Sequence, residues 1–338
     1  MEHHMRAYLL KRYGGPECAT LADVPRPKPG PGQLLVRVRA AGLNPVDYKI
    51  RQGKLRVIHS PPLPAVLGNE LAGEVVETGE GVTRFTAGQR VFARVANDAM
   101  GAFAEYACVD ASLAAEIPAS LDFTQAAGLP LAGLTALQAL RDELHVQRGD
   151  KVFISAGAGG VGTFAIQIAK HLGAHVTTTA SPRGEQLVRS LGAERVIDYT
   201  RERFEQQLSG MDGAFDLLGG ETLEHTFGIV KPGGKVVSIA ATPEPLTARQ
   251  DLGRGWPLQA LFWFASLPQR MRARRHGVGY RFLLMHPSGD DLAGLAALVE
   301  QGALRVVMDQ TFPFERIDAA LAHLESGRAK GKVVVQMG

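Results

Sequence analysis

Six residues near the middle of the chain, Gly157-Ala158-Gly159-Gly160-Val161-Gly162, have the G-x-G-x-x-G spacing of a turn that can hold a pyrophosphate. An apolar run at Lys151–Ser155 precedes them, and an apolar helical pattern at Thr163–Leu172 follows. In that context the first glycine permits a sharp turn, the second admits a pyrophosphate, and the third allows close helix–strand packing. The helix N-terminus adds free N–H groups and a positive dipole end. We therefore predict a dinucleotide-binding turn; the alternative is a glycine-rich connection that binds nothing.

The end of the next predicted strand indicates which dinucleotide binds. An NAD site usually carries an acid about 20 residues after the turn, on the ribose 2′-hydroxyl. This strand end reads Thr178-Thr179-Ala180-Ser181-Pro182-Arg183 and contains no acid. Ser181 and Arg183 can instead hold a 2′-phosphate through a hydroxyl and a charge-assisted fork. NADPH is the expected cofactor, although Arg183 is also compatible with an ordinary surface arginine.

Two patterns divide the chain. Its first part has short strands between Pro- and Gly-rich turns, such as Leu34–Ala41, which is typical of a small antiparallel barrel. After a helical segment at Thr124–Leu140, strands alternate with helices, which predicts an α/β fold with a doubly wound parallel sheet. The tail, with Leu304–Gln310 and Lys332–Gln336, is β-like again. We expect residues 1–125, completed by about 304–338, to form a substrate domain, and residues 126–303 a cofactor domain.

Composition excludes several function classes. The 338 residues have a formal charge of +3, which does not indicate nucleic-acid binding. Only two cysteines, Cys18 and Cys108, are present, so no disulfide framework or four-cysteine zinc site is expected. The first residues lack the apolar run of a signal peptide, and Leu258–Ala265 is far shorter than the ~20 residues that span a bilayer. A cytoplasmic location is expected.

Several segments, taken together and in order, resemble the quinone oxidoreductase branch of the medium-chain dehydrogenase/reductase superfamily. They are Gly42–Lys49 (GLNPVDYK), Leu67–Val75 (LGNELAGEV), Gly88–Val91 (GQRV), Leu129–Leu137 (LPLAGLTAL), the AGAGGVG turn and Ser326–Val334 (SGRAKGKVV). The resemblance covers essentially the whole length. It implies a GroES-like β-barrel substrate domain, a Rossmann domain, and an active site in the cleft between them.

The chain departs from the zinc-dependent members of that superfamily. Those members carry a cysteine where this chain has Asn44, and His-Glu where it has Asn69-Glu70. Asparagine is a poor zinc ligand, and no Cys/His pair replaces the lost ligands at useful spacing. We therefore expect no metal. The resemblance implies the zinc-independent branch, whose members reduce quinones or activated C=C bonds with NADPH.

The resemblance also suggests residues for the chemistry. Hydride transfer to an enone or quinone builds negative charge on the carbonyl oxygen, and a donor aimed there lowers the barrier. Asn44, Tyr48 and Lys49 are the catalytic candidates, with a turn-forming Asn-Pro pair as the structural alternative for Asn44. If this loop is helical, adjacent residues point about 100° apart, so Tyr48 and Lys49 are not expected to face the same site equally.

Further cofactor contacts are expected beyond the glycine turn. Thr135 resembles a residue that packs beside the nicotinamide, and Tyr199 resembles a tyrosine on the adenosine 2′-phosphate. The strand end Ser238-Ile239-Ala240 is expected at the nicotinamide side of the sheet. Lys332 is expected to approach the cofactor from the tail. Thr135 and Tyr199 are equally compatible with purely structural roles.

The leading hypothesis is a zinc-independent NADPH reductase of a small apolar quinone or α,β-unsaturated carbonyl. A 2-enoyl thioester reductase, a non-catalytic NADPH-binding interaction protein and a zinc alcohol dehydrogenase with unconventional ligands stay open. A homodimer is expected from the resemblance, with no nucleic-acid partner. Trp256–His276 combines aromatic residues with arginines; we expect it to pack on the core or a dimer partner rather than contact a membrane.

Overall fold

The computed structural model describes residues 4–97 and 99–338 and divides into two compact units. Unit 1 takes the chain up to Leu134 and again from His286 to Gly338, and unit 2 is Thr135–Met285. The predicted boundary at residue 304 therefore differs from the observed return to unit 1 at His286. The reason is helix α9 (Gly289–Glu300), which packs against β8 (Ala114–Glu116) of unit 1.

Unit 1 is built on two mainly antiparallel sheets. The larger has the order β15-β16-β3-β5-β6-β8, with β7 also paired to β3, and the smaller has the order β2-β1-β4. Their strands are β1 (His4–Leu10), β2 (Ala19–Pro25), β3 (Gln33–Leu43), β4 (Ala65–Val66), β5 (Glu70–Thr78), β6 (Arg90–Arg94), β7 (Tyr106–Asp110), β8, β15 (Met308–Pro313) and β16 (Lys332–Gln336). Strand β3 alternates apolar and basic residues, and its apolar side chains enter the core of this unit.

The helical segments of unit 1 follow turn and proline signals. They are η1 (Pro16–Cys18), α1 (Pro45–Arg51), η2 (Ala111–Leu113), α2 (Phe123–Ala127), α3 (Pro130–Leu137, which continues into unit 2), α9, η6 (Phe314–Arg316) and α10 (Ile317–Glu325). The single helix expected at Thr124–Leu140 is divided, because α2 ends at Gly128 and Pro130 opens a new helix.

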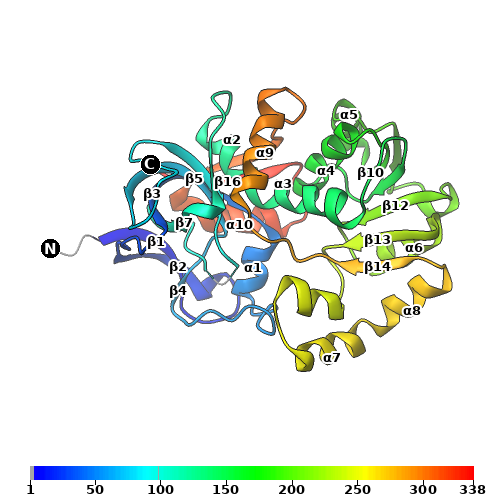
Figure 1. The fold of residues 1–338 in the computed structure, drawn as a ribbon, viewed down its shortest axis with the longest axis horizontal. Helices are drawn as coiled ribbons and strands as arrows, with labels where there is room; N and C mark the ends of the chain where they lie inside the picture. Colours follow the sequence, from blue (N-terminus) through cyan, green and yellow to red (C-terminus); the bar gives the residue numbers. More distant parts are fainter. Residues whose placement is uncertain (1–3, 98) are drawn as a thin grey trace. The chain divides into compact units, whose positions relative to one another are not determined.

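Unit 2 is a parallel sheet with helices packed on it (Figure 1). The strand order is β11-β10-β9-β12-β13-β14. Strands β10 and β11 are added on one side of β9 and strands β12 to β14 on the other, so the order of addition reverses between β9 and β12. The strands are β9 (Lys151–Ile154), β10 (His175–Ala180), β11 (Arg195–Asp198), β12 (Met211–Asp216), β13 (Val230–Ser238) and β14 (Gly279–Phe282). Ligands of such sheets bind beyond the carboxyl ends of the strands at that reversal.

The helical segments of unit 2 are η3 (Gln138–Glu143), α4 (Gly160–His171), α5 (Pro182–Ser190), η4 (Phe204–Gln206), α6 (Gly220–Ile229), η5 (Thr247–Asp251), α7 (Trp256–Ala265) and α8 (Leu267–Arg275). Helix α4 packs on β9 and β10, α5 on β10 and β11, and α6 on β12 and β13. Because helices cover the sheet, central strand β9 (KVFI) reads as an apolar run rather than an alternating one. The predicted parallel sheet is confirmed.

Candidate functional site: a dinucleotide turn in unit 2 and a buried polar cluster in unit 1

The glycine turn connects β9 to α4 and is fixed to the neighbouring strand. The N–H of Gly157 donates to the carbonyl oxygen of Thr179 at 3.1 Å, and the N–H of Ala156 donates to the Thr179 hydroxyl at 3.0 Å. Ala156 has a φ of 51°, in the left-handed region that is costly for a residue with a Cβ. Strain of this kind is concentrated at functional sites, so this turn is a candidate binding element.

The three motif glycines are required for different reasons. A Cβ at Gly157 would lie 2.3 Å from the Thr178 hydroxyl, and one at Gly162 would lie 2.4 Å from the Ala156 carbonyl oxygen. Both glycines are therefore needed for the protein's own packing. A Cβ at Gly159 would approach only the Ala156 carbonyl oxygen, at 3.4 Å. The protein leaves space over Gly159, as backbone contact with a pyrophosphate requires.

The N-terminus of α4 has no protein cap. Gly159 is the N-cap residue and supplies no side chain to the helix. The amides of Gly160, Val161 and Gly162 are the first in the helix and have no intrahelical acceptor. The helix is 12 residues long, so its dipole adds to the attraction for an anion. These residues fit the phosphates of a dinucleotide.

The expected 2′-phosphate residues lie at the ends of two adjacent parallel strands. Ala180 of β10 pairs with Asp198 of β11, so Ser181 and Tyr199 each follow directly after paired strand ends. The Arg183 side chain is exposed and makes no ion pair within the described residues. Tyr199 is also exposed. The nearby Asp198 carboxylate accepts hydrogen bonds from the Thr200 amide and hydroxyl, which lower its pKa.

The end of β13 is tied to a buried acid that sequence reasoning did not identify. The Ser238 hydroxyl donates to Asp216 Oδ2 at 2.6 Å, and the Gly219 amide donates to the same carboxylate. Burial raises the pKa of Asp216, which these hydrogen bonds partly oppose. The Ser238 side chain is thus directed to Asp216, while Ile239 and Ala240 are half-buried beyond the strand end. Thr135 is buried within α3.

Unit 1 holds a buried ion pair between Lys332 and Glu70, beside Asn44. Lys332 Nζ donates to Asn44 Oδ1 at 2.6 Å, to Glu70 Oε1 at 2.8 Å and to the Leu43 carbonyl oxygen at 3.2 Å. Asn44 Nδ2 donates to the same Glu70 oxygen at 2.6 Å, and the Leu131 amide donates to the other Glu70 oxygen at 2.6 Å. All three N–H groups of Lys332 therefore have acceptors in unit 1.

Asn69 belongs to a second part of this cluster. Its amide donates to Asp47 Oδ1 at 2.6 Å, and the backbone N–H of Asn44 donates to Asp47 Oδ2 at 2.7 Å. Arg94 is buried and donates to the carbonyl oxygen of Val95. Burial lowers the pKa of Arg94 to about 10, while Asp47 and Glu70 oppose the shift. Asn44 and Asn69 thus belong to one buried hydrogen-bond network, in which Asn44 donates to Glu70 and Asn69 donates to Asp47.

Asp47 gives this network a pH dependence. Burial raises its pKa from 3.8 to about 7, although the hydrogen bonds from Asn69 and Asn44 oppose the shift. Between these values the folded protein holds a proton that the unfolded chain has lost, so its contribution to stability declines as the pH rises from about 4 to about 7. We expect Asp47→Asn to remove this part of the slope. Urea unfolding of both proteins at several pH values measures it, and equal slopes would contradict the pKa shift.

The other two catalytic candidates lie on α1. Tyr48 and Lys49 are half-buried, and within the described residues neither side chain makes a hydrogen bond. Burial, followed by the charge of Glu325, raises the pKa of Tyr48. Burial, followed by the charge of Lys54, lowers the pKa of Lys49. Both groups keep donors available for a ligand, on directions about 100° apart because the segment is helical.

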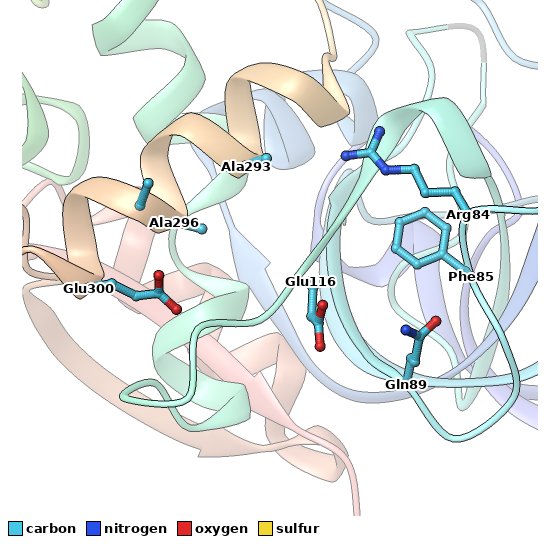
Figure 2. Close-up of a pocket in the computed structure, with 8 residues that line it drawn as sticks. Arg84, Phe85, Gln89, Glu116, Ala293, Ala296 and Glu300 are labelled. Carbon is cyan, nitrogen blue, oxygen red and sulfur yellow. The ribbon is translucent and has the colours of Figure 1, made fainter.

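Glu70 and Arg94 were not among the candidate site residues selected from the sequence. Glu70 could have been found from its place beside Asn69, but its partner Lys332 is 262 residues away. A separate pocket of about 370 Å³ in unit 1 is lined by Arg84, Phe85, Gln89 and Glu116 and by one side of α9 (Figure 2). None of the predicted site residues lines it.

The described residues contain neither a clustered metal site nor a membrane-spanning helix. No three His, Cys, Asp or Glu side chains in residues 4–97 and 99–338 gather as a metal site would require. Across the same part of the chain, no helix has the length and apolar character needed to cross a membrane.

Comparison with known proteins defines the family. Residues 30–119 match the alcohol dehydrogenase GroES-like domain, and residues 191–335 match the family described as zinc-binding dehydrogenase. The chain is 37% identical to the chloroplastic NADPH-dependent alkenal/one oxidoreductase of Arabidopsis thaliana, over 98% of this chain and 79% of that protein. It is 31% identical to the chloroplast envelope quinone oxidoreductase homolog of Arabidopsis thaliana, over 98% of each.

A solved structure agrees with these matches. The quinone oxidoreductase from Coxiella burnetii has a TM-score of 0.85 and 33% identity, over 99% of each chain. The chain therefore belongs to the quinone oxidoreductase branch of the medium-chain dehydrogenase/reductase superfamily. The predicted fold class, a GroES-like domain with a Rossmann parallel sheet, is confirmed.

Proposed function

We propose that this protein is an NADPH-dependent reductase that transfers hydride to a quinone or to the C=C bond of an α,β-unsaturated carbonyl, without zinc. The observation that carries the proposal is the open space over Gly159 at the uncapped N-terminus of α4. The printed names of the relatives, an NADPH-dependent alkenal/one oxidoreductase and quinone oxidoreductases, support the substrate class. Bound NADPH supplies the hydride.

In this proposal unit 2 selects NADPH by its phosphates. The first amides of α4 bind the pyrophosphate, and Gly159 lets it approach the backbone. Ser181, Arg183 and Tyr199 hold the 2′-phosphate, because they follow adjacent strand ends and Arg183 has no competing carboxylate partner. Thr135, Ile239 and Ala240 remain proposed contacts of the nicotinamide half.

The proposed absence of zinc rests on the polar cluster. The ammonium of Lys332 hydrogen-bonds to both Asn44 and Glu70, so the positive charge there is supplied by the protein. A zinc ion at this place would have to compete with a buried lysine for oxygen ligands, without any thiolate or imidazole. The cluster does not fit the zinc suggested by the description of the matching family. Elemental analysis of the purified protein tests this point.

Three groups are proposed to stabilise negative charge on the substrate oxygen. The Tyr48 hydroxyl and the Lys49 ammonium are not engaged by other described residues. Asn44 commits its oxygen to Lys332 and one amide hydrogen to Glu70, which leaves a second amide hydrogen to donate. A donor preorganised in this way stabilises the developing enolate or quinol anion.

Steady-state assays test the proposed function. We expect turnover of 1,4-quinones or short enones with NADPH and a preference for these substrates over 2-enoyl thioesters. NADPH binding without turnover of any of them would favour a non-catalytic binding protein. Faster reduction of acyl thioesters would favour the thioester reductase instead.

Replacing Arg183 by alanine tests the choice of dinucleotide. We expect kcat/KM for NADPH to fall about tenfold, because an exposed charge-assisted contact with the 2′-phosphate is lost. The value for NADH should not change, since NADH lacks that phosphate. Arg189→Ala on the same helix is the matched control, because Arg189 pairs with Glu185. Equal losses with both dinucleotides would contradict the role of Arg183.

We further propose a cytoplasmic homodimer. Both cysteines are free thiols, as a reducing compartment maintains them. Strand β14 ends the sheet of unit 2 and pairs on one side with β13, so within the described residues its other side is available for a second copy. Sedimentation velocity tests the dimer.

A further inference from the structure

Helix α7 exposes its apolar residues to solvent. Its sequence, WPLQALFWFA, contains no charged residue. Trp256 is 78% exposed and Phe264 68% exposed, and Leu261 and Trp263 are also exposed. Only Phe262 of this helix is buried. An apolar helix of a soluble protein normally turns such residues to the core, so this surface has a function other than packing within the chain.

The exposed residues form one continuous face. At about 100° per residue, Trp263, Trp256, Phe264 and Leu261 fall within an arc of roughly 160°, and Phe262 lies outside that arc. The helix is 10 residues long, or about 15 Å, which is too short to cross a bilayer. It is long enough to lie along a surface with its aromatic side chains inserted.

The adjoining helix α8 adds positive charge next to α7. Residues 252–276 contain five arginines and no aspartate or glutamate, and one of the five, Arg272, is paired with Glu224 of α6. The Arg270 guanidinium lies 5.4 Å from the centre of the Trp263 ring, which joins α8 to the aromatic face. Arg274 and Arg275 are exposed and have no ion-pair partner within the described residues. They share one side of α8 with the exposed Met271, three and four residues earlier.

We propose that α7 and α8 dock this protein on an anionic lipid bilayer. The aromatic residues of α7 insert at the level of the headgroups, while Arg274 and Arg275 contact lipid phosphates. A second copy placed against this same face would bring two sets of arginines together with no carboxylate from the segment to neutralise them. The proposal revises the sequence-based expectation of no membrane contact, and it is independent of the proposed reaction.

The chain carries its own probe for this surface. It has two tryptophans, Trp256 and Trp263, and both lie on α7. In the absence of NADPH, we expect the tryptophan fluorescence emission to move to shorter wavelength when vesicles of phosphatidylcholine and phosphatidylglycerol at 7:3 are added. Brominated lipid in such vesicles should quench it. Vesicles of phosphatidylcholine alone, or added salt, should weaken the effect, because the arginines require anionic lipid.

Matched charge-reversal variants test whether vesicle binding depends on the arginines of α8. Arg274→Glu combined with Arg275→Glu should weaken vesicle binding more than about tenfold. Arg195→Glu combined with Arg203→Glu changes the charge equally near β11, at the opposite edge of the sheet from β14, and should leave binding unchanged. Absence of a shift with anionic vesicles would overturn the proposal. A shift that instead follows protein concentration without lipid would identify a second copy as the occupant.

Discussion

Gly159→Asp is expected to weaken NADPH binding by at least about 100-fold while the protein remains as stable as before, or becomes slightly more stable. Gly159 is the N-cap of α4 in extended geometry, which is where aspartate is favoured. Its Cβ would contact only the Ala156 carbonyl oxygen, at 3.4 Å, and its carboxylate would accept hydrogen bonds from the first amides of the helix. The same carboxylate would then occupy the phosphate position and repel the pyrophosphate. The loss of two charge-assisted hydrogen bonds, each about 1.5–3 kcal/mol, sets the magnitude.

Two further variants give this experiment its controls. Gly255→Asp places the same change at the N-cap of α7, where a Cβ meets only Pro257 at 3.8 Å, and should leave NADPH affinity unchanged. Gly162→Ala should destabilise the fold, because its Cβ would clash with backbone at 2.4 Å. Titration of NADPH fluorescence measures affinity, and urea unfolding measures stability. Normal NADPH affinity in Gly159→Asp would exclude the turn as the pyrophosphate site.

Lys332→Met is expected to have the largest effect on stability. It leaves the fully buried carboxylate of Glu70 without its ammonium partner, which costs about 3–5 kcal/mol for a buried pair. We expect the melting temperature to fall by roughly 10 °C. Lys330→Met makes the same substitution two residues earlier, where the lysine side chain has no ion pair among the described residues, and should change little.

A double-mutant cycle isolates the ion pair itself. Glu70→Gln combined with Lys332→Met removes both charges, so the double variant should lose less stability than the sum of the single changes, by about 1–3 kcal/mol. Differential scanning calorimetry or urea unfolding gives the three values. Strict additivity would mean that Lys332 and Glu70 do not depend on each other, contrary to the 2.8 Å contact.

The glycine turn could be predicted because its determinants are local. Strand, turn and helix follow one another within about twenty residues, and each motif glycine has a backbone reason that spacing alone reveals. Arg183 could be selected for the same reason, since it follows a predicted strand, whereas Tyr199 was selected through the family resemblance. Exposure and freedom from ion pairs, which decide whether Arg183 can bind a phosphate, depend on what the fold brings near it.

The polar cluster could not be predicted as a unit. Lys332 is 288 residues from Asn44, and only strand pairing between β16 and β3 brings the tail to the loop. The sequence therefore indicated Asn44 and Lys332 separately, as a catalytic candidate and a cofactor contact. Ser238 illustrates a different limit: its strand could be predicted, but the direction of its hydroxyl depends on the buried Asp216.

Hydropathy also does not distinguish a core helix from an exposed one. For Trp256–His276 the sequence predicted packing on the core or on a dimer partner; most of α7 does not pack on the core of its own chain, and packing on a partner stays a prediction. Whether the apolar residues of α7 are buried depends on how the preceding loop orients the helix toward the rest of the chain. Arg281, which is paired with Glu244 before η5 and with Asp251 at the end of η5, anchors the chain just before α7. Those partners are 30 or more residues from Arg281 and have no shared motif.

The pairing of β16 with β3 sets an order of events on the ribosome. Strand β3 is complete by Leu43 and pairs with β5 and, through Gln33–Arg37, with β7. The antiparallel partner of Ala40–Leu43 is β16, at Lys332–Gln336, so this end of β3 lacks one neighbour until β16 has been synthesised. Unit 2 is continuous in sequence and can close its parallel sheet earlier. During translation the sheet of unit 1 therefore stays incomplete after unit 2 has been able to fold. Chaperone dependence and nascent-chain aggregation should be concentrated in this waiting period.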